Sequence, residues 1–119
     1  MHCIIWHIEQ YWEAELDAQL KKGLLEICVL SAIEREESYG YKIISDLAPY
    51  IVISESTLYP ILRRLEQSGA VKTRSVEFNG RLRRYFSITN VGREKLKDFV
   101  DSMPEFERIK KFIMRGKWL

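Results

Sequence analysis

Basic side chains are concentrated in the middle of this 119-residue chain, among hydroxyl and amide groups. Residues 54–88 hold 7 basic and 3 acidic side chains, a balance of +4, whereas residues 1–53 hold 4 and 9, a balance of −5. Guanidinium and ammonium groups bind phosphate oxygens, and hydroxyl and amide groups bind phosphates and base edges. The segment therefore predicts a surface that faces a polyanion, against the simpler alternative of a solvated charged face. Its candidate contact residues are Ser54, Ser56, Thr57, Tyr59, Pro60, Arg63, Arg64, Gln67, Lys72, Arg74, Arg81, Arg83 and Arg84.

Other kinds of chemistry find little support in the sequence. It shows no nucleophile–base set, paired carboxylates or phosphate-cradling glycine loop, so we expect no enzyme. His2, Cys3 and His7 lack the spacing of a zinc site, so we expect no metal and no cofactor. Two cysteines do not make a disulfide framework, and no apolar run is long enough to cross a membrane. We therefore expect a protein of the reducing cytoplasm.

A helix over residues 54–69, SESTLYPILRRLEQSG, is predicted to present the first half of the candidate residues. Ser54 or Ser56 can cap its start, because a hydroxyl accepts a hydrogen bond from an unpaired backbone N–H, and Gly69 can end it in a left-handed conformation. At helical spacing one stripe is apolar and consists of Leu58, Ile61, Leu62 and Leu65. The opposite side holds Ser56, Pro60, Arg63 and Gln67, with Tyr59 and Arg64 at the edges.

The remaining candidate residues fall on a predicted β-hairpin. Strand-like runs at residues 70–78 and 81–88 flank Asn79-Gly80, a strong hairpin signal because both residues accept positive φ. Pairing across this turn predicts the register Val71–Ile88 and Thr73–Phe86. The hairpin is thus expected to carry five basic side chains beside a small apolar base.

The flanking sequence supplies the other elements. Residues 9–36 are helix-forming, residues 41–47 predict a short helix, and residues 51–53, IVI, predict a short strand. After the hairpin, a helix is expected over residues 89–114, interrupted at Pro104. Three helices followed by a basic hairpin is the element order of a winged helix-turn-helix. The expected fold class is therefore mainly α with a β-hairpin wing (α+β), followed by a C-terminal dimerisation helix.

This arrangement predicts binding to duplex DNA by a dimer. The helix at 54–69 would enter a major groove, and the hairpin would contact the backbone or a minor groove. In the last helical region, apolar residues recur at alternating spacings of three and four, which predicts a seam between two helices. The seam and its neighbours are Leu96, Phe99, Val100, Met103, Phe106 and Ile113.

Four stretches of the chain are similar to a known family. They are GLLEICVLSAI, YGYKIISDL, SESTLYPILRRLEQSGAV and GRLRRYFSITNVGREKL, and together they cover roughly residues 20–96. By these stretches the chain resembles the PadR family of bacterial transcriptional regulators, in the short form with a single C-terminal helical region.

The resemblance implies a homodimeric repressor on a palindromic operator. It implies an N-terminal helical extension at 1–19 that contributes to the dimer, a winged helix-turn-helix DNA-binding domain at 20–88, and a dimerisation helix at 89–119. Trp12 and Leu16 would then join the dimer interface, because in such proteins the last helix packs with the partner's N-terminal helix. Several family members release DNA when a small aromatic or hydrophobic effector binds, so such an effector is an expected partner.

Two alternatives stay open from the sequence. The first is a winged helix that binds another protein and has no specific DNA site. The second concerns the tryptophans at positions 6, 12 and 118, which could line an effector cavity or pack in the core and dimer; we expect packing. We likewise expect Tyr39 and Tyr41 to pack in the core and at a turn rather than to bind a ligand.

Overall fold

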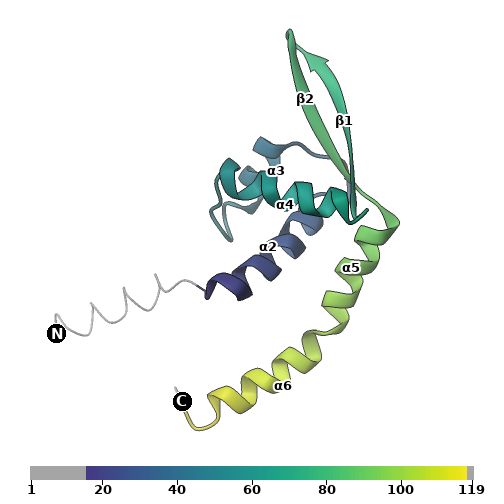
Figure 1. The fold of residues 1–119 in the computed structure, drawn as a ribbon. Helices are drawn as coiled ribbons and strands as arrows, with labels where there is room; N and C mark the ends of the chain where they lie inside the picture. The colour runs from purple at the N-terminus through teal and green to yellow at the C-terminus, as the bar shows by residue number, and fades with distance from the viewer. Residues whose placement is uncertain (1–15, 118–119) are drawn as a thin grey trace, which may run out of the picture.

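The computed structural model describes residues 16–117 and shows a helical domain, a long hairpin and a helical arm (Figure 1). The predicted contacts of Trp6, Trp12 and Trp118 lie outside the described residues. The elements in chain order are α2 (Ala18–Ala32), α3 (Gly40–Leu47), α4 (Glu55–Gln67), β1 (Val71–Phe78), β2 (Arg81–Ile88), α5 (Asn90–Asp101) and α6 (Met103–Met114). The expected fold class, mainly α with a β-hairpin wing, is confirmed.

The core lies where α2, α3 and α4 meet the base of the hairpin. The predicted apolar stripe of α4 is buried in full, with each of its four side chains at most 3% exposed. It packs against Val29 and Leu30 of α2, Ile43 of α3 and Phe86 of β2. The three helices and the hairpin base therefore share one hydrophobic core.

The ends of α4 follow from local chemistry. The choice between the two serines is settled, because the Ser54 hydroxyl accepts a hydrogen bond from the Thr57 N–H at 3.3 Å. Gly69 has φ 81°, the left-handed conformation that ends a helix. Pro60 lies in the second turn and donates no backbone hydrogen bond there. The predicted helix is confirmed at both ends.

The hairpin has the predicted register. Val71 faces Ile88 across the two antiparallel strands, and Thr73 faces Phe86. Asn79 and Gly80 have φ of 51° and 76°, which allows the strands to be joined by a two-residue turn.

The predicted short strand at residues 51–53 is wrong. These residues form the loop between α3 and α4, with Ile53 buried and Val52 81% exposed. The outer edge of β2 is occupied instead by Ser38, whose N–H and carbonyl pair with Phe86 at 3.0 and 2.7 Å. A strand needs an edge to pair with, and Ser38 already fills this one.

The C-terminal part consists of two helices, as the predicted interruption at Pro104 required. Thr89 caps α5, Ser102 ends it, and Pro104 lies in the first turn of α6, where its missing N–H costs least. The chain leaves the hairpin base through α5 and continues into α6 as an arm that extends away from the core (Figure 1). No helix among the described residues is long and apolar enough to cross a membrane.

Candidate nucleic-acid interface

The exposed side of α4 presents the predicted polar residues. Ser54, Ser56 and Thr57 cluster at its start, with hydroxyl oxygens 2.8 and 3.2 Å from that of Ser54. The first N–H groups of a helix and its dipole favour an anion at this end. Further along, three more candidate residues are exposed: Pro60, Arg63 and Gln67. The start of α4 therefore combines hydroxyl groups with a partial positive charge.

Tyr59 differs from these neighbours because it is half-buried. Its ring packs against the core, and a Cβ added at Gly40 of α3 would lie 2.4 Å from its hydroxyl oxygen. The side chain lies at the edge of the apolar stripe, as helical spacing indicated, and it does not project freely beside Arg63. Its structural role is to hold α4 against α3; a DNA contact by Tyr59 stays a prediction.

An open hollow of about 930 Å³ lies between the start of α4 and the hairpin. Tyr41 of α3, together with Glu55 and Tyr59 of α4, lines one side of it. The other side is formed by the hairpin tip, including Arg81, Arg83 and Arg84. The fold thus brings the hairpin arginines close to the start of α4, which lines the hollow with Glu55 and Tyr59.

Two of the hairpin arginines are held by neighbouring side chains. Arg83 lies over the rings of Tyr39 and Phe78, at 4.3 and 4.5 Å from their centroids. Arg84 lies 5.4 Å from the centre of the Phe86 ring and 3.9 Å from Glu66. Both residues keep part of their surface exposed, and aromatic stacking leaves the charge of a guanidinium available to an anion.

Arg74 is held more firmly, by an ion pair with Glu37. Its Nε donates to Glu37 Oε2 at 2.9 Å, its Nη2 pairs with the other carboxylate oxygen, and its guanidinium lies 5.1 Å from the Tyr85 ring centre. The hydrogen bond from Arg74 lowers the pKa of Glu37 below its usual value. Arg74 therefore ties the hairpin to the segment before α3, which weakens its candidacy as a phosphate contact.

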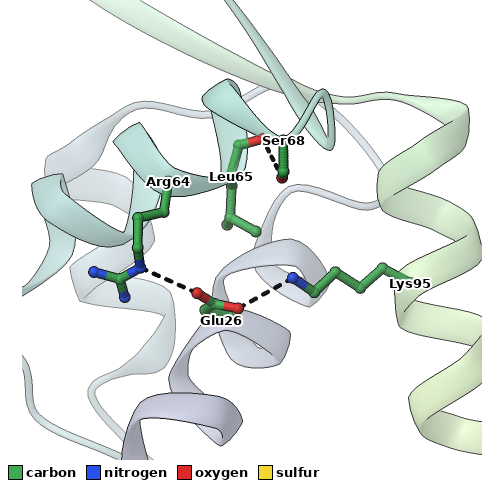
Figure 2. Close-up of polar contacts among 5 residues, drawn as sticks. All are labelled: Glu26, Arg64, Leu65, Ser68 and Lys95. Atoms are coloured by element: carbon green, nitrogen blue, oxygen red, sulfur yellow. Dashed lines mark hydrogen bonds and ion pairs between the residues drawn. The ribbon is translucent and has the colours of Figure 1, made fainter.

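Arg64 points away from the hollow. Its Nε donates to Glu26 Oε1 of α2 at 3.2 Å, and Lys95 of α5 donates to Glu26 Oε2 at 3.1 Å (Figure 2). Burial raises the pKa of Glu26, but the hydrogen bonds and charges of Lys95 and Arg64 outweigh this effect and lower it overall. The structure places Arg64 in the contact between α4 and α2, and it does not support Arg64 as a DNA contact.

Within residues 16–117, four of the candidate cations have no carboxylate within salt-bridge distance: Arg63, Lys72, Arg81 and Arg83. Arg63 also lines a smaller hollow of about 230 Å³ between α4 and β2, together with Arg84. These cations without a salt bridge are the strongest candidates for phosphate or base contacts.

The predicted dimer residues divide into two groups. Leu96 is only 8% exposed, because α5 packs against α2, so it has little surface left for the predicted seam between two helices. Phe99 is half-buried. The exposed members are Leu16, Val100, Met103, Phe106 and Ile113.

Sequence reasoning missed two further exposed apolar residues of α6. Ile109 is 50% exposed and Phe112 is 64% exposed. The three- and four-residue spacing passed over both positions, although apolar residue type alone would have marked them. None of the side chains of α6 is buried within the chain.

Comparison with known proteins identifies the class. A PadR-like transcription factor from Bacteroides fragilis is 31% identical, with a TM-score of 0.73 over 81% of this chain and 95% of its own. A PadR-like transcriptional regulator from Bacillus cereus is 30% identical, with a TM-score of 0.70 over 84% of this chain and 100% of its own. PadR of Bacillus subtilis, solved in complex with operator DNA, shares the fold at 22% identity, with a TM-score of 0.60 over 64% of this chain and 46% of its own.

The winged helix described above is therefore the fold of these regulators. Residues 29–98 match the transcriptional regulator PadR-like family, which is more than half of the chain. The chain belongs to the PadR-like family of transcriptional regulators, and the resemblance seen in its sequence is confirmed.

Proposed function

We propose that this protein is a transcriptional regulator that binds a specific duplex DNA sequence as a homodimer. The observation that carries the proposal is the hollow shared by the start of α4 and the hairpin arginines. A helix end with exposed hydroxyl groups suits a major groove, and a basic hairpin beside it suits the adjacent backbone. The structure of Bacillus subtilis PadR with operator DNA supports this use of the fold.

The residues divide by role within this proposal. Ser56, Thr57 and Arg63 project from α4 and would contact base edges. The side chains that would bind phosphates are Ser54, Gln67, Lys72, Arg81, Arg83 and Arg84. Pro60 would contribute apolar contact with the groove. Arg64 and Arg74 would act indirectly, because each is paired with a carboxylate of the same chain.

The apolar side of α6 supports the homodimer. Met103, Phe106 and Ile113 lie on one side of the arm and are 36%, 49% and 57% exposed. A lone helix with such a surface requires a partner, and two-fold self-association is the commonest arrangement. Leu16, two residues before α2, is 48% exposed and would extend this interface. Under this organisation residues 1–19 and 89–119 build the dimer, and residues 20–88 bind DNA.

A two-fold dimer implies an operator with two-fold symmetry. Its half-sites would lie about 34 Å apart, one turn of DNA, so that each α4 can enter a major groove on the same side of the duplex. Binding across a promoter would exclude polymerase, which makes repression in the bacterial cytoplasm the proposed outcome. A small hydrophobic or aromatic effector is the proposed signal for release, by analogy with other family members.

Selection of bound sequences from a random duplex library tests the proposal. We expect a palindromic consensus bound by the dimer. If a dimer neutralises about six to ten phosphates, its affinity should fall roughly 10³–10⁵-fold between about 50 and 200 mM salt. Selection that yields no consensus, together with binding that does not respond to salt, would contradict the proposal and favour a winged helix that binds protein.

A further inference from the structure

Glu26 connects three helices that are distant in sequence. It lies on α2, and its two carboxylate oxygens accept from Arg64 of α4 at 3.2 Å and from Lys95 of α5 at 3.1 Å (Figure 2). The Glu26 side chain is 20% exposed, and those of Arg64 and Lys95 are 39% and 42% exposed. This contact joins α4, the recognition helix that would enter the DNA groove, to α5, which with α6 forms the dimer arm.

The contact depends on the negative charge of Glu26. Its carboxylate lies between two cations, and their hydrogen bonds keep its pKa low despite partial burial. Without that charge, the two cations of α4 and α5 would face each other across α2 with no counter-charge between them. Neutralising Glu26 should therefore loosen α5 from α4 rather than only remove one hydrogen bond.

A second contact fixes the start of α5. The Thr89 hydroxyl donates to the Gly69 carbonyl at 2.5 Å, and the Thr89 N–H donates to the Ala70 carbonyl at 3.0 Å. A Cβ added at Gly92 would lie 2.3 Å from the Ala70 carbonyl oxygen, so α5 crosses this backbone closely. One turn further along α5, Lys95 reaches Glu26. Two anchor points on one helix determine its direction.

The direction of α5 matters because the arm is long. The 12 residues of α5 and the 12 of α6 place the apolar side of α6 far from the recognition helix. At 1.5 Å per residue the lever is roughly 30 Å, so a rotation of about 10° at α5 moves its far end by about 5 Å. That movement exceeds the spacing of one base pair, about 3.4 Å.

We propose that Glu26 is a positioning residue that, through Arg64 and Lys95, fixes the angle between the recognition helix and the dimer arm and thereby sets the half-site spacing that the dimer accepts. This inference rests on the proposed DNA-binding function. Glu26 itself does not touch DNA in this arrangement, because its neighbours lie on the side of α4 away from the hollow.

The test compares wild type with Glu26→Gln on operators whose half-site spacing is changed by one and two base pairs. The wild type should lose at least about tenfold in affinity when the spacing changes. Glu26→Gln should lose less than about threefold, and it should bind a single half-site within about twofold of wild type. Glu34→Gln is the matched control, since it removes one carboxylate from an exposed position and should keep the wild-type spacing profile.

A second variant distinguishes the loss of this contact from misfolding of the protein. Lys95→Met keeps the Glu26–Arg64 pair and removes only the contact with α5, so it should relax the spacing preference in the same way. Lys97→Met is its control, because Lys97 pairs with Asp101 within α5. An unchanged spacing profile in both Glu26→Gln and Lys95→Met, or equal losses on half-site and full operator, would overturn the inference while leaving the proposed function intact. Failure of the wild type to select any operator would overturn both.

Discussion

The winged domain and the C-terminal arm differ in how far they bury phenylalanine side chains. Phe86, at the base of the hairpin, is 2% exposed, whereas Phe112 of α6 is 64% exposed. The domain has enough converging surfaces to cover its apolar residues, since three helices and the hairpin base meet at one core. In the arm, α6 has no second layer packed over it among the described residues. The difference indicates that the domain can fold alone and that the arm requires another surface.

Truncating the two phenylalanines should give the largest contrast. Phe86→Ala leaves a cavity in the core and should lower the free energy of unfolding by about 3–5 kcal/mol. Phe112→Ala should change it by less than about 1 kcal/mol at low protein concentration, because the ring is mostly exposed within the chain. Urea denaturation measures both, and equal losses would show that the arm belongs to the same folding unit as the domain.

A charge on the apolar side of α6 should separate the dimer from the fold. Phe106→Glu should weaken self-association by about 2 kcal/mol or more and operator binding with it, while the monomer stays folded. Sedimentation at micromolar concentration and circular dichroism give the two readouts. Lys111→Glu is the control, because it places a carboxylate on the other side of the same helix. A monomeric wild type with intact operator binding would contradict the dimer.

The junction between the winged domain and the arm should be sensitive to a substitution at Gly92 of α5. Gly92→Ala would bring its Cβ to 2.3 Å from the Ala70 carbonyl oxygen. Relieving this clash should cost about 1–3 kcal/mol of unfolding free energy. Gly23→Ala on α2 has no heavy atom within 4 Å of its added Cβ, and it should instead stabilise the protein by up to about 1 kcal/mol. Thermal unfolding of the two variants measures this difference in sign.

Within the domain, two adjacent arginines should differ in their effects. Arg63→Ala should weaken binding to the selected operator by about 1–3 kcal/mol and leave the unfolding free energy nearly unchanged. Arg64→Ala removes a partner of Glu26 and should lower stability, with a smaller direct effect on binding. Fluorescence anisotropy on operator and random duplexes, combined with urea denaturation, distinguishes these outcomes. Equal losses of affinity on both duplexes would reassign Arg63 to backbone contact.

The smallest expected effect is an acid-dependent loss of stability at the α2–α4–α5 contact. The pKa of Glu26 in the folded state is below its usual value of 4.5, so its contribution is fully present above that value. The contribution is lost as the pH falls through the lower folded pKa. The difference in unfolding free energy between wild type and Glu26→Gln should therefore be constant near neutral pH and shrink below 4.5. A difference that grows in acid would contradict the charged contact.

The sequence by itself determined the elements whose signals are local. Ser54 and Gly69 defined the ends of α4, because capping and left-handed backbone involve only neighbouring residues. Asn79-Gly80 defined the hairpin and its register, because a two-residue turn leaves one way to pair the strands. The break at Pro104 followed from the missing N–H of proline. The order of these elements was sufficient to predict a winged helix.

The tertiary structure alone decided what each exposed charge and each short apolar run does. Arg63 and Arg64 are adjacent and alike in sequence, yet only Arg64 meets Glu26, 38 residues away. Arg74 is held by Glu37, 37 residues earlier in the chain, and Ser38 occupies the outer edge of β2. Such pairings depend on how helices pack across a long separation in the chain, and no local pattern records them. The same reason explains why Leu96 is buried while Phe106, ten residues later, is 49% exposed.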